Sequence, residues 1–411
     1  MLPGEPMNIS LARLSFTTTT LLGTLSVVQP ALANQNQDNF EQEIDSVCSL
    51  VFQNEDPVCF ERTQPGSTTT AQVTPDEEPA LHTSLVQISG DQVSNVSNHL
   101  AGMRRQRAAG GGNNTAAREL LRGYVGGTAG SELISNARFS AFFSGSMVDG
   151  DQDNTDYEVG YDLKTDHYTL GADLQLNSEW LFGFAYGTTE TELEYNSDFD
   201  DRTENDSDHY ILYASWYRAN FAVDMTLGYS EGEFETQRQL PDAIATGSTD
   251  NDMVYVSVSG AFDFSQGGWT YGPLAKLDYV DGQIDGFAEQ GDSVWKAEFD
   301  DQDVKSSIYS MGGQVAYAQS FSWGVVLPYA QGVWRYELKD DRDLIVGRFS
   351  VSPTEDFIIT PDDPDRSWFE VSAGLTAVFP HGISAFVSYE ELISYADTDL
   401  YTVSAGARLE F

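Results

Sequence analysis

Two cysteines are the most specific candidates for covalent chemistry in this sequence. Cys48 and Cys59 are the 2 cysteines of the chain, and ten residues separate them. No histidine lies nearby, so a zinc ion would lack its usual ligands there. In an exported protein such a pair would most simply close one small disulfide loop. We therefore expect a Cys48–Cys59 disulfide.

A run of aspartates resembles the start of a calcium-binding loop. Asp149, Asp151 and Asp153 stand at the alternating positions that such a loop uses. The pattern then fails, because Asn154 replaces the turn glycine and Gly160 replaces the final glutamate. We interpret the run as a solvated acidic loop. Weak binding of divalent cations by the acidic loops stays open, but we expect no dedicated metal or cofactor site.

The histidines are the remaining candidates for catalysis. A serine hydrolase needs a serine, a histidine and a polar orienting group in contact. His167 and His209 lie near the ends of predicted strands and serines are common, but nothing identifies a nucleophile. We therefore expect no enzymatic activity and no catalytic residue, with a barrel-embedded hydrolase as the third and weakest function hypothesis.

Charge and composition narrow the class of protein. The 411 residues carry a net charge of -43, which makes nucleic acid a poor partner. Mean hydropathy is only -0.33 although 20 tyrosines and 23 phenylalanines are present. No apolar run reaches the roughly 18 residues of a membrane-spanning helix. A membrane β-barrel fits this mixture, because half of each strand and all of the loops are polar.

The amino-terminal residues 1–33 resemble a signal peptide. A short apolar core at 21–28 precedes Ala31 and Ala33, which form an A-x-A cleavage site. The mature chain would then start at Asn34. Residues 34–80 are polar and mostly irregular in their pattern, as in a linker.

Residues 81–134 are predicted to form a helical linker or plug. Apolar residues recur at three- and four-residue steps over 81–109, glycines follow at 110–112, and a second short helix is expected over 115–124. Basic residues near the helix end suit the helix dipole. Either they mark a solvated helix end, or they contact carboxylates in the lumen of a barrel; the residues in question are Arg104, Arg105, Arg107, Arg118 and Arg122.

From residue 138 onward, alternating segments of about ten residues predict a β-barrel. Short turns and long loops alternate between them, and both ends fall on the side of the short turns. That arrangement predicts an all-β fold, a transmembrane antiparallel twelve-stranded barrel over 135–411, with extracellular long loops and both barrel ends periplasmic. The predicted strands are 138–148, 166–176, 180–192, 208–217, 221–231, 252–264, 269–281, 307–319, 324–337, 367–379, 383–391 and 401–411.

Several stretches resemble one family. Residues 135–187, 271–291, 327–337 and the alternating terminal strand 401–411 together resemble the translocator domain of type V autotransporters. The resemblance implies a helix that crosses the barrel and leads to a secreted passenger. The chain departs from the family in the passenger, which is very short, since only about a hundred residues lie between the signal peptide and the barrel.

The resemblance also implies roles for individual residues. The barrel-insertion machinery would read the terminal strand, and thus Tyr401, Leu409 and Phe411. Some members of the family cleave their passenger at an Asn-Asn pair inside the barrel. Asn113-Asn114 matches such a pair, but a glycine-rich turn explains it equally, and we do not predict cleavage.

The function hypothesis follows from these features. We expect a barrel in the outer membrane of a Gram-negative bacterium that translocates or displays its own short amino-terminal segment. The alternative is a porin-like channel or an anchored barrel, with the helix as a plug. Expected partners are outer-membrane lipid and, during biogenesis, the secretion translocon, periplasmic chaperones and the barrel-insertion machinery; we expect a monomer.

Overall fold

The structure, a computed structural model, describes residues 43–50, 59, 73–75, 77–111, 138–155, 158–197, 200–339, 344–362, 365–395 and 397–411. Within these residues, no helix is both long enough and apolar enough to cross a bilayer. One long helix, α3 (Glu78–Gly111), precedes the strands. A shorter helix covers residues 43–50.

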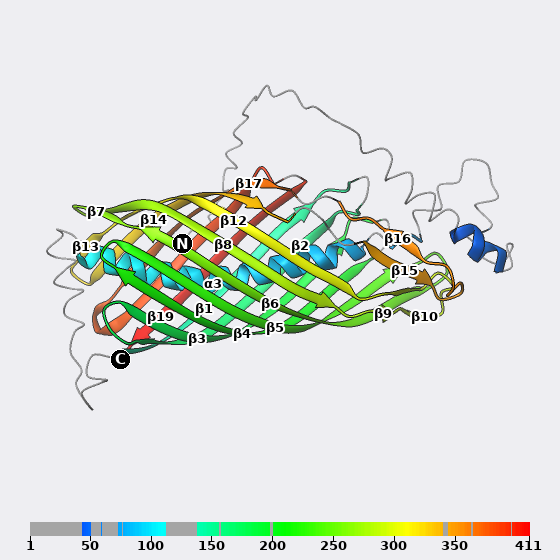
Figure 1. Cartoon of the computed structure of the whole chain (residues 1–411), viewed down its shortest axis with the longest axis horizontal. Coiled ribbons are helices and arrows are strands. Elements are labelled where there is room, and N and C mark those ends of the chain that lie inside the picture. Colours follow the sequence, from blue (N-terminus) through cyan, green and yellow to red (C-terminus); the bar gives the residue numbers. More distant parts are fainter. Residues whose placement is uncertain are drawn as a thin grey trace, which may run out of the picture.

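Twelve long antiparallel strands form the wall of a closed barrel (Figure 1). Closure is achieved by the first and last strands, which pair from Ser140↔Glu410 to Gln152↔Thr398. The short strands β7 (Phe264–Gln266), β10 (Gln290–Gly291) and β13 (Gln319–Phe321) extend its edges. The predicted fold class is therefore confirmed. The wall strands are β1 (Arg138–Gln152), β2 (Tyr161–Gln175), β3 (Trp180–Tyr195), β4 (Arg202–Arg218), β5 (Phe221–Gln239), β6 (Ile244–Phe262), β8 (Trp269–Ile284), β12 (Gln302–Tyr317), β14 (Gly324–Glu337), β17 (Ser367–Val378), β18 (Ile383–Ile393) and β19 (Thr398–Glu410).

The two faces of the wall differ in polarity, as the alternation predicts. Large apolar side chains such as Phe143, Leu170 and Leu227 are exposed on the outside. Inward positions carry small polar side chains, for example the buried Ser144 and Thr169. An apolar exterior with a polar interior is the reverse of a soluble barrel and suits a wall that faces lipid.

At one end the wall strands are joined by short turns, and at the other by long loops; we call these the turn end and the loop end. Strands reach further toward the loop end than predicted, since β2 begins at 161 rather than 166 and β6 at 244 rather than 252. Apart from Ile244, the added residues of these two strands are polar on their outward faces, so the sequence pattern resembles that of a loop. These extensions project beyond the apolar band of the wall.

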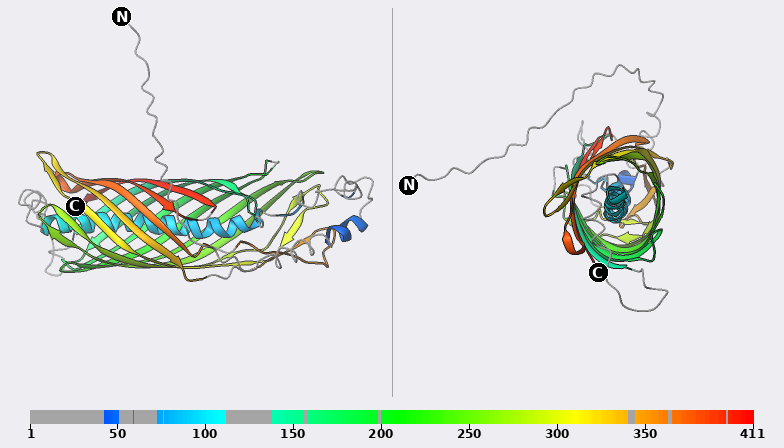
Figure 2. Two further views of the ribbon diagram at one scale, coloured as in Figure 1. Left: turned by 90° about the horizontal axis from the view of Figure 1, so that it is seen from above. Right: turned by 90° about the vertical axis from the view of Figure 1, so that its left-hand side faces the viewer.

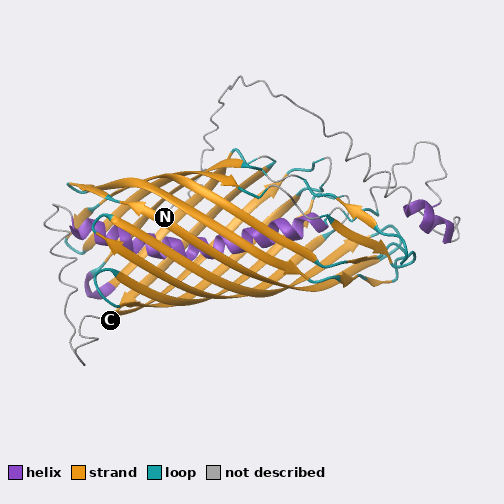
Figure 3. Cartoon of the chain, in the orientation of Figure 1, coloured by secondary structure: helices purple, strands orange, loops and turns teal. Residues whose placement is uncertain are grey.

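A second, small sheet stands at the loop end. It has the order β16-β15-β11-β9 and is built from two long loops. Its strands are β9 (Phe287–Ala288), β11 (Ala297–Phe299), β15 (Ile345–Phe349) and β16 (Phe357–Ile359). The helix of residues 43–50 lies beside it, beyond the rim of the barrel (Figures 1 and 3). The sequence pattern had indicated mostly irregular chain at residues 34–80, and burial of Ile44 and Val47 against this sheet explains the difference.

Candidate functional site

The lumen of the barrel is occupied by α3. Figure 2 shows the helix end-on within the ring of strands. Its apolar side chains Leu85, Val96 and Leu100 belong to the same core as Leu181 and Tyr255 of the wall. The helix is too polar for an ordinary core, however, because Gln92, Asn95, His99, Arg104 and Arg105 are buried as well. Such groups need partners from the inward face of the wall.

Amide groups of the helix meet hydroxyl groups of the wall at the middle of the lumen. Gln92 Nε2 donates to Thr189 Oγ1 at 3.0 Å, and Thr169 Oγ1 donates to Gln92 Oε1 at 3.0 Å. Asn95 Nδ2 lies 3.4 Å from Thr169 Oγ1. The absence of a side chain at Gly187 leaves space for the Gln92 side chain, because a Cβ at position 187 would lie 2.8 Å from Gln92 Oε1. These bonds fix the depth at which the helix sits.

A buried network centred on Asp173 joins the helix to the closing strands. His99 Nε2 lies 3.0 Å from Asp173 Oδ2, and Ser140 Oγ donates to the same oxygen at 2.9 Å. Tyr213 donates its hydroxyl to Asp173 Oδ1, and Arg408 Nε lies 3.5 Å from Oδ2. The His99 ring also stacks on the Phe142 ring, with ring centroids 3.8 Å apart.

Glycine at position 183 is required for this network. In the sheet register Gly183 stands between Asp173 and Tyr213. The tyrosine ring lies across the glycine, where an added Cβ would be 2.0 Å from Tyr213 Cζ. A side chain at this position would block the path of the hydroxyl to the carboxylate.

Three arginines near the carboxyl end of α3 contact the wall. Arg104 Nη1 lies 2.7 Å from Asp224 Oδ2, and Arg104 Nε lies 3.7 Å from Asp263 Oδ2. The guanidinium of Arg105 lies 3.5 Å from the centre of the Tyr329 ring, and that of Arg107 lies 4.0 Å from the Tyr217 ring. We call Arg104, Arg105 and Arg107 the arginine collar. Buried cations paired with carboxylates and aromatic rings are the arrangement in which such charges are tolerated.

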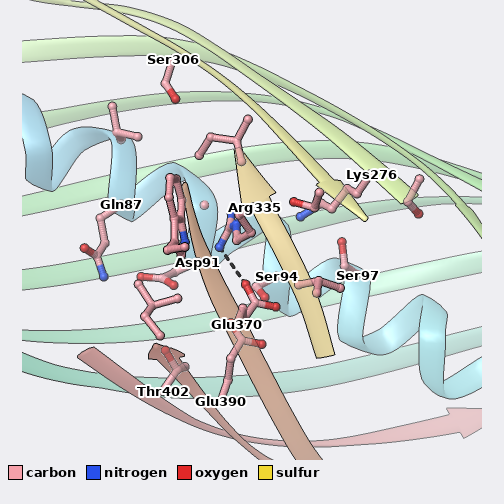
Figure 4. A pocket seen from close by; sticks show the side chains of 18 of the residues that line it. Gln87, Asp91, Ser94, Ser97, Lys276, Ser306, Arg335, Glu370, Glu390 and Thr402 are labelled. Carbon is pink, nitrogen blue, oxygen red and sulfur yellow. Dashed lines mark hydrogen bonds and ion pairs between the residues drawn. The ribbon is translucent and has the colours of Figure 1, made fainter. Parts of the chain in front are cut away.

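Opposite the bonded face of α3, the lumen keeps a cavity of about 210 Å³. Figure 4 shows Asp91, Ser94 and Ser97 of the helix facing the cavity, with side chains of the wall around them. Arg335 Nη1 lies 2.7 Å from Glu370 Oε2 there. Within the described part of the chain, Arg335 Nε and Trp368 Nε1 are buried without a hydrogen-bond partner. Orphan polar atoms in a polar cavity of this size are normally bonded to water.

Two histidines lie close together in the lumen, and the sheet register pairs one of them with a serine, but all of these side chains are buried. Thr189 Oγ1 lies 2.7 Å from His167 Nδ1 and 3.0 Å from His209 Nε2, and all three side chains are buried. Ser230 stands in a GxSxG spacing, Gly228 to Gly232, and pairs with His209 in the register. A nucleophile elbow requires a sharp turn between strand and helix. Ser230 instead is fully buried within the regular strand β5.

Other predicted residues are distributed over the molecule. Cys48 and Cys59 are joined in a disulfide at the loop end. Tyr401, Leu409 and Phe411 are exposed on the outer wall, and Phe411 N donates to Phe139 O at 2.8 Å. Among the described residues, no group of three metal-binding side chains is present. The remaining candidates lie outside the described residues: Ala31, Ala33, Asn34, Asn113, Asn114, Arg118, Arg122 and the predicted helix 115–124.

A family model, the autotransporter beta-domain, matches residues 141–390, more than half of the chain. The chain belongs to the autotransporter β-domain family. Among solved structures, the barrel is similar to the translocator domain of the autotransporter NalP from Neisseria meningitidis, with a TM-score of 0.60 at 12% identity. That match covers 82% of this chain and 99% of the other. The β-domain of the Bordetella autotransporter BrkA gives a TM-score of 0.51 at 16% identity, over 66% of this chain and 99% of the other.

Curated relatives of this autotransporter barrel are much longer proteins. Esterase EstA of Pseudomonas aeruginosa is 24% identical over 297 residues, which cover 71% of this chain and 43% of the relative. Outer membrane protein B of Rickettsia japonica is 24% identical over 201 residues, 46% of this chain and 12% of the relative. The chain thus spans less than half the length of these relatives. Family and fold together identify an outer-membrane barrel of Gram-negative bacteria.

Proposed function

We propose that this barrel translocates its own short amino-terminal segment through its lumen and displays it on the cell surface. The observation that carries the proposal is the course of α3. The helix runs through the lumen, and Glu77, directly before it, lies at the loop end, where Tyr195 donates its hydroxyl to Glu77 O at 3.2 Å. A chain that enters at the turn end and leaves at the loop end has crossed the wall's full apolar band.

The outward face of β3 supports an extracellular loop end. From Trp180 to Tyr186 its exposed side chains are aromatic, and from Glu190 to Glu194 they are carboxylates. In the register, Glu190 faces Asp206, which faces Glu233 on the next strand. Like charges directly opposite repel each other unless water and ions screen them. This part of the wall therefore belongs in water, beyond the apolar band, and long loops on that side are typical of the extracellular end.

Insertion into the membrane would depend on the last strand. Tyr401 and Leu409 project outward from β19, and the terminal Phe411 is 74% exposed. We propose that these three residues carry the signal read by the insertion machinery. Secretion across the inner membrane would use the signal peptide, with Ala31 and Ala33 before the cleavage point and Asn34 as the first mature residue.

The test is the surface location of the amino-terminal segment. An epitope tag after Asn39 is probed on intact cells with antibody, before and after added protease. A tag at 241–243, in a loop-end loop, serves as the surface control, and one at 177–179, in a turn, as the periplasmic control. We expect the Asn39 tag to be labelled and shaved like the surface control. Labelling only after the outer membrane is permeabilised would overturn the proposal.

A second candidate function, a channel with α3 as its plug, is favoured by the lumen cavity. The cavity is lined by helix residues from His82 to Arg104, about 33 Å of helix at ~1.5 Å per residue. Deleting residues 81–125 would raise bilayer conductance if α3 is a plug, and unchanged conductance would contradict a plug. Since an emptied translocator also conducts, surface labelling remains the test that separates the two functions.

Hydrolysis is not part of the proposal. The name of one relative is Esterase EstA, and esterase activity is a property of that protein. In this chain the serine of the GxSxG spacing, Ser230, is fully buried in the wall. We expect the purified protein to show no activity on p-nitrophenyl esters above that of a Ser230→Ala variant.

A further inference from the structure

The described amino-terminal residues are buried in a core at the loop end of the barrel. Ile44 and Val47 are both 0% exposed, and Cys48 and Cys59 lie in the same core. The opposite side of that core comes from the loop sheet and its flanks: Leu240, Ala245, Phe287, Trp295, Ala297, Phe299, Ile345, Phe349, Phe357 and Ile359. Segments that are far apart in the sequence thus share one apolar interior, outside the lumen.

Neither half of this core is expected to fold alone. The loop sheet has four strands of only 2 to 5 residues each. Strands this short need a packed face to be stable. The helix of residues 43–50 is likewise too short to persist in water by itself. Each half covers the apolar surface of the other, so the two are expected to form together.

A buried arginine fixes the place where the chain leaves the barrel. Arg238, at the loop end of β5, donates from Nη1 to Val73 O at 3.0 Å. Its Nε and Nη2 donate to Glu289 at 3.0 and 2.7 Å, and Glu289 in turn accepts from Ala297 N at 2.6 Å. The guanidinium therefore ties the wall, the amino-terminal chain and β11 of the loop sheet together. Charge-assisted bonds of this kind are stronger and more specific than neutral ones.

We propose that residues 43–50 and Cys59 pack on the loop sheet and Val73 as one folded cap, and that this part of the chain stays bound to the barrel without its covalent link through α3. The inference rests on the proposed function, because a surface location of the cap requires translocation. It goes further in assigning the short passenger a structural role: the segment is retained by a built interface on the extracellular loops, and is not a free end held only by its tether.

The test separates docking from tethering by cutting the tether. A site for a sequence-specific protease, flanked by glycine and serine, is inserted between residues 66 and 67, and the tag after Asn39 is kept. Intact cells are labelled, treated with the protease and washed, and the tag is measured on cells and in the medium. A gel shift of the barrel reports complete cleavage. The fragment contains both cysteines, so the disulfide cannot hold it to the barrel.

Matched variants test the interface itself. Val47→Asp places a carboxylate in the core, whereas Ser49→Asp changes an exposed position on the same helix. We expect the parent and Ser49→Asp fragments to stay on the cells after cleavage, and Val47→Asp to release at least tenfold more tag into the medium.

Each outcome has one meaning. Release of the parent fragment as fast as that of Val47→Asp would overturn the cap, even with translocation intact. Absence of surface label before cleavage would instead overturn the proposed function. If Val47→Asp alone lacks surface label, the parent and Ser49→Asp still decide between docking and tethering.

Discussion

His99 Nε2 of the lumen helix lies 3.0 Å from Asp173 Oδ2 of β2, and this contact joins the helix to the seam where the barrel closes. Asp173 also accepts a hydrogen bond from Ser140 of β1, and Arg408 of β19 lies 3.5 Å from its carboxylate. One side chain thus connects α3 with the first, second and last strands. The helix that leads to the passenger is therefore held against the polar inner face of the closed wall.

Asp173→Ala is expected to destabilise the barrel. The change removes the carboxylate that His99 and Tyr213 contact and that lies near the buried Arg408, and breaking a buried charged pair costs about 3 to 5 kcal/mol. Denaturant unfolding of the detergent-folded protein measures the loss. Asp162→Ala is the control, because Asp162 is an exposed carboxylate on the same strand. Equal stability of the two variants would contradict a structural role for Asp173.

Gly183→Ala is expected to break the hydrogen bond from the Tyr213 hydroxyl to Asp173 in the same network. The new methyl group would lie 2.0 Å from Tyr213 Cζ, so the ring must move away from Asp173. Overpacking of this kind costs about 1 to 3 kcal/mol. Gly260→Ala is a matched control, since its nearest atoms would be 3.8 Å away.

The same pair can be examined as a double-mutant cycle. If Gly183→Ala acts by displacing the tyrosine hydroxyl, adding Tyr213→Phe should cost little more than Gly183→Ala alone. If the losses of unfolding free energy caused by Gly183→Ala and Tyr213→Phe add in full, Gly183 does not act by making space for the Tyr213 hydroxyl.

The wall of the barrel was largely predictable, because lipid imposes its pattern on every strand. In β3, for instance, aromatic residues from Trp180 to Tyr186 alternate with small or buried ones. Strand ends at the loop side were not predictable. In β4, which was predicted to begin at 208, Arg202, Glu204 and Asp206 continue the strand outside the apolar band, and exposed charged residues on a strand give the same sequence pattern as those in a loop.

The sequence predicted which kinds of side chain meet in the lumen, but not which residue of the helix contacts which residue of the wall. Arg104 was a candidate for meeting carboxylates, and the sequence contains a signal for them, since Asp173, Asp224 and Asp263 occupy the inward phase of their strands. Which carboxylate meets which helix residue depends on strand register and helix depth, and neither is encoded locally. The loop sheet was not predicted, because its strands of 2 to 5 residues are too short for an alternating pattern to be distinguished from the surrounding loops.

Arg104→Ala is expected to loosen the arginine collar and raise conductance. Arg104 neutralises Asp224 at 2.7 Å and approaches Asp263 at 3.7 Å, so its loss leaves two carboxylates near the turn end without their cation. Repulsion between them would widen the passage beside α3. Single-channel recording in planar bilayers should show larger or more frequent openings than for the parent protein.

Arg202→Ala is the matched control for this measurement, because Arg202 has a side chain 53% exposed and lies on the outer wall. Arg104→Lys keeps the charge and should restore most of the closed state. Identical recordings for Arg104→Ala and Arg202→Ala would show that the collar does not limit the passage.

The cap at the loop end is expected to weaken as the pH rises. Burial, a side-chain hydrogen bond with Glu355 and the charges of Glu355 and Asp356 together raise the pKa of Glu43 from its ordinary value of 4.5 to about 7. Burial also raises the pKa of Glu78, at the start of α3, to about 8. A carboxyl group with a raised pKa binds its proton more tightly in the docked state. Docking is therefore strongest below about pH 4.5, and its stability falls as the pH rises through about 7 to 8.

Retention of the cleaved amino-terminal fragment at pH 5 and at pH 8.5 measures this dependence. We expect the parent fragment to dissociate faster at pH 8.5, because the buried Glu43 would then be ionised close to the acidic groups of Glu355 and Asp356. Glu43→Gln keeps the shape of the side chain and has no proton to lose, so its fragment should show a smaller change between the two pH values. Asp292→Asn, at an exposed position of the same loop region, serves as a control for charge alone. A Glu43→Gln fragment as sensitive to pH as the parent would assign the effect to another group, with Glu78 the next to be substituted.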